Sequence, residues 1–179
     1  MSTQVIEKTT TYLTFTLGEE VFSVDVSKVR EVLEYTKITK VPKVPEFMRG
    51  VINLRGTVVP VIDLKLKFGM GVTKDTIDTV IVVMEVALNE AKELTVLGML
   101  TDSVQEVIDM EPDSIEPAPH VGASVNTDFI KGMGKRNGNF IIILNIDKVF
   151  EGKELEVVKT ASARSRLNIS QTEEAEEEE

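Results

Sequence analysis

Residue types that perform chemistry are scarce in this chain. None of its 179 residues is cysteine and only one is histidine, His120, which follows Pro119 in an expected loop. Without cysteine, disulfides, thiol catalysis and thiolate metal sites are excluded. A histidine ligand normally comes with companions, so a lone histidine gives little support to a metal or catalytic site.

Carboxylates form the other candidate cluster. Asp102, Asp109, Glu111 and Asp113 lie close together in the sequence, and carboxylate oxygens bind hard cations. Their spacing lacks the regularity and fixed glycine of a calcium loop, which favours a solvated surface. Residues 132–134, Gly-Met-Gly, lack the third glycine of a dinucleotide-binding loop. A small β-barrel hydrolase is therefore a poor alternative, and we expect a protein without catalytic residues, cofactor or metal.

The charge is concentrated at the C-terminal end. The net charge is −10 at pH 7, and six glutamates between Glu173 and Glu179 carry most of it. Residues 164–179 are therefore predicted to form a disordered acidic tail, which either keeps the chain soluble or makes a weak contact with a basic partner. An acidic chain with no tryptophan and two tyrosines is poorly suited to nucleic acid, which needs basic clusters and aromatic platforms.

The N-terminal region gives no targeting signal. Residues 1–11 lack the basic start and apolar stretch of a signal peptide, and we expect them to be flexible. The longest apolar run, residues 80–84, is far shorter than the ~20 residues that span a bilayer. A cytoplasmic protein with no direct membrane insertion is the expectation, and the missing cysteines agree with a reducing compartment.

Alternation of apolar and polar residues predicts a mostly β fold. The predicted hairpins pair residues 12–17 with 21–26, 48–54 with 57–62, and 79–86 with 94–100 across a polar turn at 89–93. Residues 27–34 fit either a helical face or a strand. Pro60 donates no ladder hydrogen bond, which predicts an edge strand or a bulge there. Single helical turns are expected at 64–68 and 146–150, and a longer C-terminal helix at 155–163.

An internal duplication organises these elements. Residues 47–64 align without a gap with residues 129–146 at an offset of 82, and Gly56 meets Gly138 at the hairpin turn. Residues 29–34 resemble residues 104–109 at an offset of 75. We expect two similar lobes with intertwined boundaries, roughly 20–80 and 81–150, each a small barrel within one domain at 12–163.

The repeated segment also carries a family motif. Asn53-Leu54-Arg55-Gly56 lies within FMRGVINLRGTVVPVIDL at 47–64, and YLTFTLG at 12–18 and EPAP at 116–119 accompany it. Together these segments resemble CheW-type chemotaxis coupling proteins over most of the chain.

The resemblance implies two five-stranded, SH3-like β-barrel lobes on a shared apolar core. It also implies a non-catalytic adaptor that joins the regulatory domain of a chemotaxis histidine kinase (CheA-type) to the cytoplasmic tip of methyl-accepting chemoreceptors at the inner face of the membrane. Longer relatives carry a receiver domain, for which this chain is too short. An adaptor of a related pathway, for surface motility or second-messenger output, remains the alternative.

The resemblance also selects candidate contact residues. Arg55 is the first, because its planar guanidinium could hold a carboxylate bidentately. Glu31 is the implied partner, and we hypothesise that a Glu31–Arg55 pair fixes the groove between the lobes. The neighbouring turn residues Asn53 and Leu54 belong to the same set.

Valines supply the apolar part of the expected site. Val29 and Val32 could form a floor for a receptor helix, and Leu33 is assigned to the core. Val104 and Val107 are their second-lobe equivalents and could line the opposite wall. Gly50 permits close backbone approach and could touch a partner only through its backbone, whereas Gly56 and Gly138 are structural turn residues. The second lobe has Lys135-Arg136-Asn137-Gly138 in place of the Arg55 motif, so we expect the Arg-centred contact in the first lobe alone.

Overall fold

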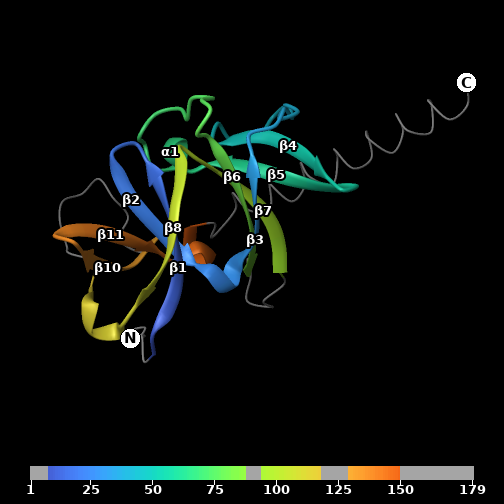
Figure 1. Cartoon of the computed structure of the whole chain (residues 1–179). Coiled ribbons are helices and arrows are strands. Elements are labelled where there is room, and N and C mark those ends of the chain that lie inside the picture. Colours follow the sequence, from blue (N-terminus) through green and yellow to red (C-terminus); the bar gives the residue numbers. More distant parts are fainter. Residues whose placement is uncertain (1–7, 88–93, 118–128, 150–179) are drawn as a thin grey trace, which may run out of the picture.

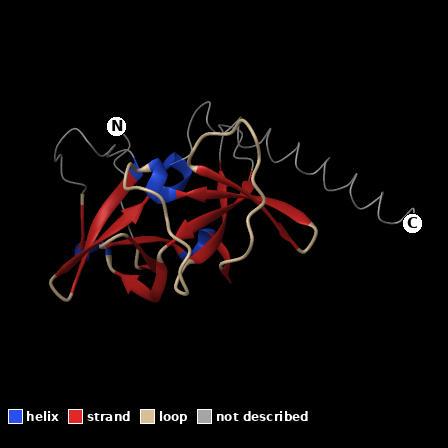
Figure 2. Cartoon of the chain, turned by 90° about the horizontal axis from the view of Figure 1, so that it is seen from above, coloured by secondary structure: helices blue, strands red, loops and turns tan. Residues whose placement is uncertain are grey.

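The computed structural model describes residues 8–87, 94–117 and 129–149. Eleven strands dominate these residues, and the helices are single turns (Figure 2). In the first half the elements are β1 (Thr10–Leu17), β2 (Glu20–Asp25), the 3-10 turn η1 (Val26–Lys28), β3 (Val29–Glu34), β4 (Met48–Leu54), β5 (Thr57–Asp63) and α1 (Leu64–Lys67). In the second half they are β6 (Val80–Ala87), β7 (Leu94–Thr101), β8 (Ser103–Met110), the 3-10 turn η2 (Pro112–Ser114), β9 (Ile115–Glu116), β10 (Ile130–Arg136), β11 (Asn139–Leu144) and α2 (Ile146–Val149).

The strands form two sheets. One has six strands in the order β8-β1-β2-β11-β10-β9, and the other has five in the order β3-β6-β7-β5-β4 (Figure 1). This confirms the prediction of a mostly β fold with two lobes. The sixth strand, β9, is only two residues long, and the isolated bridge between Thr39 and Val51 occupies the matching place beside β4.

Each sheet takes strands from both halves of the sequence. The hairpin β1–β2 joins β8 to β11, and the corresponding hairpin β6–β7 joins β3 to β5. The sheets therefore use residues 10–25 with 103–144, and residues 29–101. The approximate lobe ranges 20–80 and 81–150 do not coincide with the sheets, because each half exchanges its first hairpin with the other.

The duplication is visible in the backbone. Both repeated hairpins shift register at the same place, between Met48 and Gly50 in one and between Ile130 and Gly132 in the other. Asp63 N–H donates to the Phe47 carbonyl at 2.7 Å, and its equivalent Asn145 donates to Phe129 at 2.8 Å. The gapless alignment at offset 82 therefore corresponds to a real structural equivalence.

Alternating side chains fill three apolar clusters. On β6, Val82 and Met84 point into a large core shared by both sheets, while Ile81 and Val83 point into a core of the five-stranded sheet alone. A third cluster, which includes Tyr12, belongs to the six-stranded sheet. Both faces of the central strands are thus buried, which explains their nearly continuous apolar sequences.

Two local predictions change. Residues 27–34, which fitted either a helix or a strand, form the end of η1 and then β3. Pro60 is not on an edge strand, because β5 lies between β4 and β7. Its partner Val51 exchanges both backbone hydrogen bonds with Thr39 at 2.8 Å on the far side, and pairing with β7 begins only at Val61. The missing N–H therefore costs no ladder bond.

Several predictions lie outside the described residues. They are residues 1–7 of the segment 1–11 that was predicted to be flexible, the turn at 89–93, the loop at His120, the helix at 155–163 and the acidic tail at 164–179. Thr10 and Thr11 of that N-terminal segment instead belong to β1. None of the helices that the structure describes is long and apolar enough to cross a membrane.

Candidate functional site

The β4–β5 hairpin presents Arg55 at its tip. Leu54 pairs with Thr57, and Arg55 and Gly56 between them have φ of 50° and 87°. Such two-residue turns place both central residues in the left-handed region, which favours asparagine and glycine. The Asn53 side chain accepts a hydrogen bond from Gly56 N–H at 2.8 Å. Local structure thus holds the hairpin tip in one conformation.

Arginine is an unexpected residue at this position. The equivalent turn of the second half has Asn137 and Gly138, with φ of 52° and 79°, which is the favoured pair. A non-glycine residue held at positive φ costs on the order of 1 kcal/mol, and such strain concentrates at functional sites. Arg55 therefore departs from the residue preference of such turns, which the equivalent residue Asn137 follows.

Arg55 and Glu31 form the expected ion pair. Arg55 Nη1 donates to Glu31 Oε1 at 3.4 Å, and Nη2 donates to Oε2, so the contact is bidentate. The Arg55 side chain is 75 % exposed and that of Glu31 is 26 % exposed. At such exposure the pair contributes at most about 1 kcal/mol to stability, and its geometry leaves the guanidinium open to solvent.

The pair does not link the two lobes. Glu31 lies on β3 and Arg55 at the tip of β4–β5, so the contact brings together the two edge regions of the five-stranded sheet. Glu31 pairs with Val83, which points into the core of that sheet alone. The hypothesis that the pair fixes a groove between the lobes is therefore not supported by its position.

Four valines lie on the opposite face of the edge strands. Val32 on β3 pairs with Val82, and Val107 on β8 pairs with Leu13, both of which belong to the shared core. Cross-strand partners point to the same face of a sheet. Val32 and Val107, which are 44 % and 56 % exposed, therefore extend the shared core outward to solvent.

The two remaining valines complete this surface. Val29 and Val104 are half-buried and pack against the shared core. The four residues, called the valine strip below, form two equivalent pairs at offset 75 on the sheet edges β3 and β8, which belong to different sheets (Figure 1). Leu33 packs into the core of the five-stranded sheet, as predicted.

Gly50 has a structural reason for its identity. It is buried with φ of 144°, and a Cβ there would lie 2.8 Å from the Thr39 carbonyl carbon and nearer still to its oxygen. Any larger residue would push the β3–β4 connection away from β4. A contact of Gly50 with a partner stays a prediction.

A buried carboxylate beside this region escaped sequence reasoning. Asp63 has no exposed surface and accepts hydrogen bonds from Arg49 Nη1 at 3.1 Å, Thr73 N–H at 2.9 Å and Thr73 Oγ1 at 2.6 Å. It also caps α1 by accepting from Lys65 N–H. The available signal was an aspartate directly before an apolar helical turn, the usual N-cap pattern. Asp63 holds the α1–β6 connection in place.

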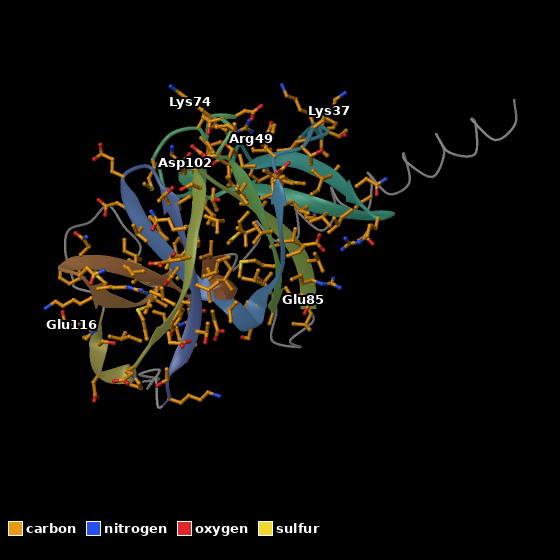
Figure 3. The ribbon with its side chains drawn as sticks, in the orientation of Figure 1. Lys37, Arg49, Lys74, Glu85, Asp102 and Glu116 are labelled. Carbon is orange, nitrogen blue, oxygen red and sulfur yellow. The ribbon has the colours of Figure 1, made fainter. Side chains whose placement is uncertain are left out.

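Asp102, like Asp63, holds separate elements together, in this case elements of the two sheets. Its N–H donates to the Thr16 carbonyl at 3.0 Å, its carboxylate accepts from Gly18 N–H at 2.6 Å, and Lys65 Nζ lies 3.2 Å away. The β7–β8 junction is thereby tied to the β1–β2 turn and to α1. Figure 3 shows Asp102 and Arg49 at the same end of the molecule.

The remaining candidate sites among the described residues are a metal cluster and an open pocket. No group of three histidine, cysteine, aspartate or glutamate side chains in 8–87, 94–117 and 129–149 could hold a metal ion. An open pocket at the Asp102 junction contains Lys65, Lys74 and Asp78 beside hydroxyls of Thr16 and Ser103. Its acidic and basic groups are balanced, and Lys65 is already paired with Asp102.

Comparison with known proteins assigns the family. The family model described as the CheW-like domain matches residues 11–154. The chain belongs to the CheW-like domain family. It is 34 % identical to the chemotaxis protein CheW of Klebsiella aerogenes over 148 residues, 82 % of this chain and 85 % of that protein. It is 31 % identical to CheW of Rhizobium meliloti over 144 residues, 80 % and 89 % of the two chains.

A solved structure agrees with both sequence and fold. The crystal structure of the scaffolding protein TtCheW from Thermoanaerobacter tengcongensis superposes with a TM-score of 0.70 at 37 % identity. The match covers 81 % of this chain and 90 % of that one. The resemblance drawn from the NLRG motif is thereby confirmed. This chain is a homologue of the chemotaxis proteins named CheW and shares the fold of TtCheW.

Proposed function

We propose that this CheW-like protein is a non-catalytic adaptor that couples methyl-accepting chemoreceptors to the histidine kinase of chemotaxis. The valine strip supports this most directly. Apolar side chains that continue the core to solvent at two equivalent sheet edges are suited to receive an apolar stripe from another protein. The name of the TtCheW structure, a scaffolding protein, supports the same class of role.

The valine strip fits an amphipathic helix. A helix that docks in an apolar groove presents anchors at i, i+3, i+4 and i+7 on one face. In this proposal Val29 and Val32 on β3 form one wall for the helix, and Val104 and Val107 on β8 form the other. We assign this surface to the helical cytoplasmic tip of a chemoreceptor.

Arg55 supplies the polar contact of the proposal. It stands at the hairpin tip with its guanidinium exposed, and Glu31 fixes its direction without burying it. A preoriented, exposed arginine can hold a partner carboxylate bidentately at reduced entropic cost. We assign Arg55 to the regulatory domain of the kinase, whose similarity to the coupling protein suggests pseudo-symmetric pairing.

A binding titration with a receptor-tip fragment tests the valine strip. Val32→Glu should weaken binding about tenfold or more, because a charge would have to be buried among apolar groups. Ile77→Glu is the matched control, since Ile77 is 99 % exposed and lies on the α1–β6 connection, outside both edge strands. Equal affinities of Val32→Glu and the parent chain would reject the assignment.

A further inference from the structure

Three lysines form an exposed row on the β3–β4 connection. They are Lys37, Lys40 and Lys43, called the lysine strip below, and all three are exposed. Each is followed by an apolar residue that packs inward: Ile38, Val41 and Val44. The connection thus alternates anchors and lysines, and Figure 3 shows Lys37 at the outer margin of the molecule.

The backbone holds the lysine strip in a fixed shape. Thr39 exchanges two hydrogen bonds of 2.8 Å with Val51, and Met48 N–H donates to the Pro45 carbonyl at 3.0 Å. Lys43 itself has a φ of 59°, a conformation that its neighbours must enforce. Residues 42 and 43 form a bend, so the strip is shorter than the about 20 Å that six fully extended residues would span. Its charges are therefore arranged in a preformed row.

The charges of the lysine strip are uncompensated. Within the part of the chain that the structure describes, no ion pair involves Lys37, Lys40 or Lys43. The connection, residues 35–47, contains one acidic residue, Glu46. The row is thus net positive in a chain whose net charge is −10.

We propose that the lysine strip binds the chain's own C-terminal glutamates, Glu173, Glu174 and Glu176 to Glu179. These six residues carry the opposite charge within seven positions of the sequence, as the three lysines do within residues 37–43. The structure describes the chain as far as Val149, and 23 residues separate it from Glu173.

That connection is long enough for an intramolecular contact. A chain of this length reaches at most about 80 Å when fully extended, and a folded domain of about 150 residues has a radius of gyration of about 15 Å. Tethering on this scale gives an effective concentration in the millimolar range. Several weak, exposed ion pairs therefore suffice for substantial occupancy at low salt, and screening should release them at high salt.

Amide chemical shifts of the full-length protein test the proposal. The first variant replaces all six glutamates with glutamine, and the second carries K37Q, K40Q and K43Q. A charge-matched control carries K131Q, K135Q and R136Q on β10, in the other sheet. Spectra are recorded at low protein concentration, in low salt and again with about 1 M salt, where the Debye length is about 3 Å.

The expected result is a localised change. Neutralising the glutamates should shift amides of residues 36–44, and high salt should shift the same amides of the parent chain in the same direction. The K37Q/K40Q/K43Q variant should shift the amides of 173–179, whereas the control variant should leave them in place. Unchanged amides at 36–44 in the glutamine variant would overturn the proposal. Shifts that vanish on dilution would also overturn it, because the contact would then join separate chains.

Discussion

Replacing Asp63 with asparagine tests whether the buried carboxylate organises the α1–β6 connection. Asparagine keeps the shape of the side chain, removes its charge, and turns one acceptor oxygen into a donor that faces Arg49 or Thr73. Removing one member of a buried ion pair usually costs about 3–5 kcal/mol. The Arg49 side chain is 27 % exposed and can regain water, so we expect the lower end, about 3 kcal/mol.

Equilibrium urea unfolding gives this free energy, and amide hydrogen exchange locates its origin. The Thr73 amide, which donates to Asp63 at 2.9 Å, should lose its protection in Asp63→Asn. Thr73→Val removes only the hydroxyl donor and should cost about 1.5–2 kcal/mol. Asp109→Asn is the control, since its carboxylate is exposed and its loss should cost less than about 1 kcal/mol. A cost below about 1 kcal/mol for Asp63→Asn, or a still protected Thr73 amide, would refute the reasoning.

Further changes test packing and burial. Gly50→Ala should cost more than about 3 kcal/mol or prevent folding, because its Cβ would meet Thr39, whereas Gly138→Ala, with open space around it, should cost about 1 kcal/mol for its positive φ alone; similar costs in urea unfolding would contradict this. Tyr12→Phe should stabilise the protein by about 1 kcal/mol at pH 7, since the buried hydroxyl has no hydrogen-bond partner among the described residues. Burial also raises the pKa of Tyr12 above its ordinary value of about 10. The folded state therefore favours the neutral phenol, and the stability linked to it is present below pH 10 and lost as the pH rises through the folded pKa. The parent chain should thus lose more stability than Tyr12→Phe above pH 10, and parallel pH profiles would argue against the burial effect.

Local patterns predicted the hairpins well. The turn at Gly56 and the Asn137-Gly138 turn both appear where the sequence placed them, because positive φ requirements restrict such turns to few residues. The equivalent bulges in β4 and β10, beside the aligned glycines Gly50 and Gly132, were not predicted. Short-range signals therefore carried most of the secondary structure.

The pairing of hairpins into sheets could not be predicted in the same way. An amphipathic hairpin such as β1–β2 can pair with any sheet edge that has an apolar face. Nothing in the sequence of this hairpin selects β11 over β5 as its partner strand. The parallel contacts of Ser23 with Ile143 and of Gly98 with Val61 decide the exchange. Such long-range pairs are set by packing of the whole shared core. The edge-strand prediction at Pro60 failed for a related reason. Pairing of β5 with β7 begins one residue later, at Val61, so Pro60 can lie on a central strand.

The candidate site was predictable in part. The Glu31–Arg55 pair followed from the family resemblance, and the structure forms it. That Glu31 lies on the face of β3 opposite Val29 did not follow, because the bulge between Val29 and Glu31 changes which face each residue takes. Asp63 was missed because its partner Thr73 comes from a connection with no periodic pattern.

The most direct test of the adaptor proposal is calorimetric titration of this chain with the regulatory domain of a chemotaxis histidine kinase. Arg55→Glu is measured in parallel, with Arg136→Glu on the equivalent hairpin as the control. We predict micromolar binding for the parent chain and for Arg136→Glu, and a loss of at least tenfold for Arg55→Glu. Binding that survives Arg55→Glu would remove Arg55 from the kinase contact. No binding to the kinase domains of several chemosensory pathways would contradict the coupling function itself.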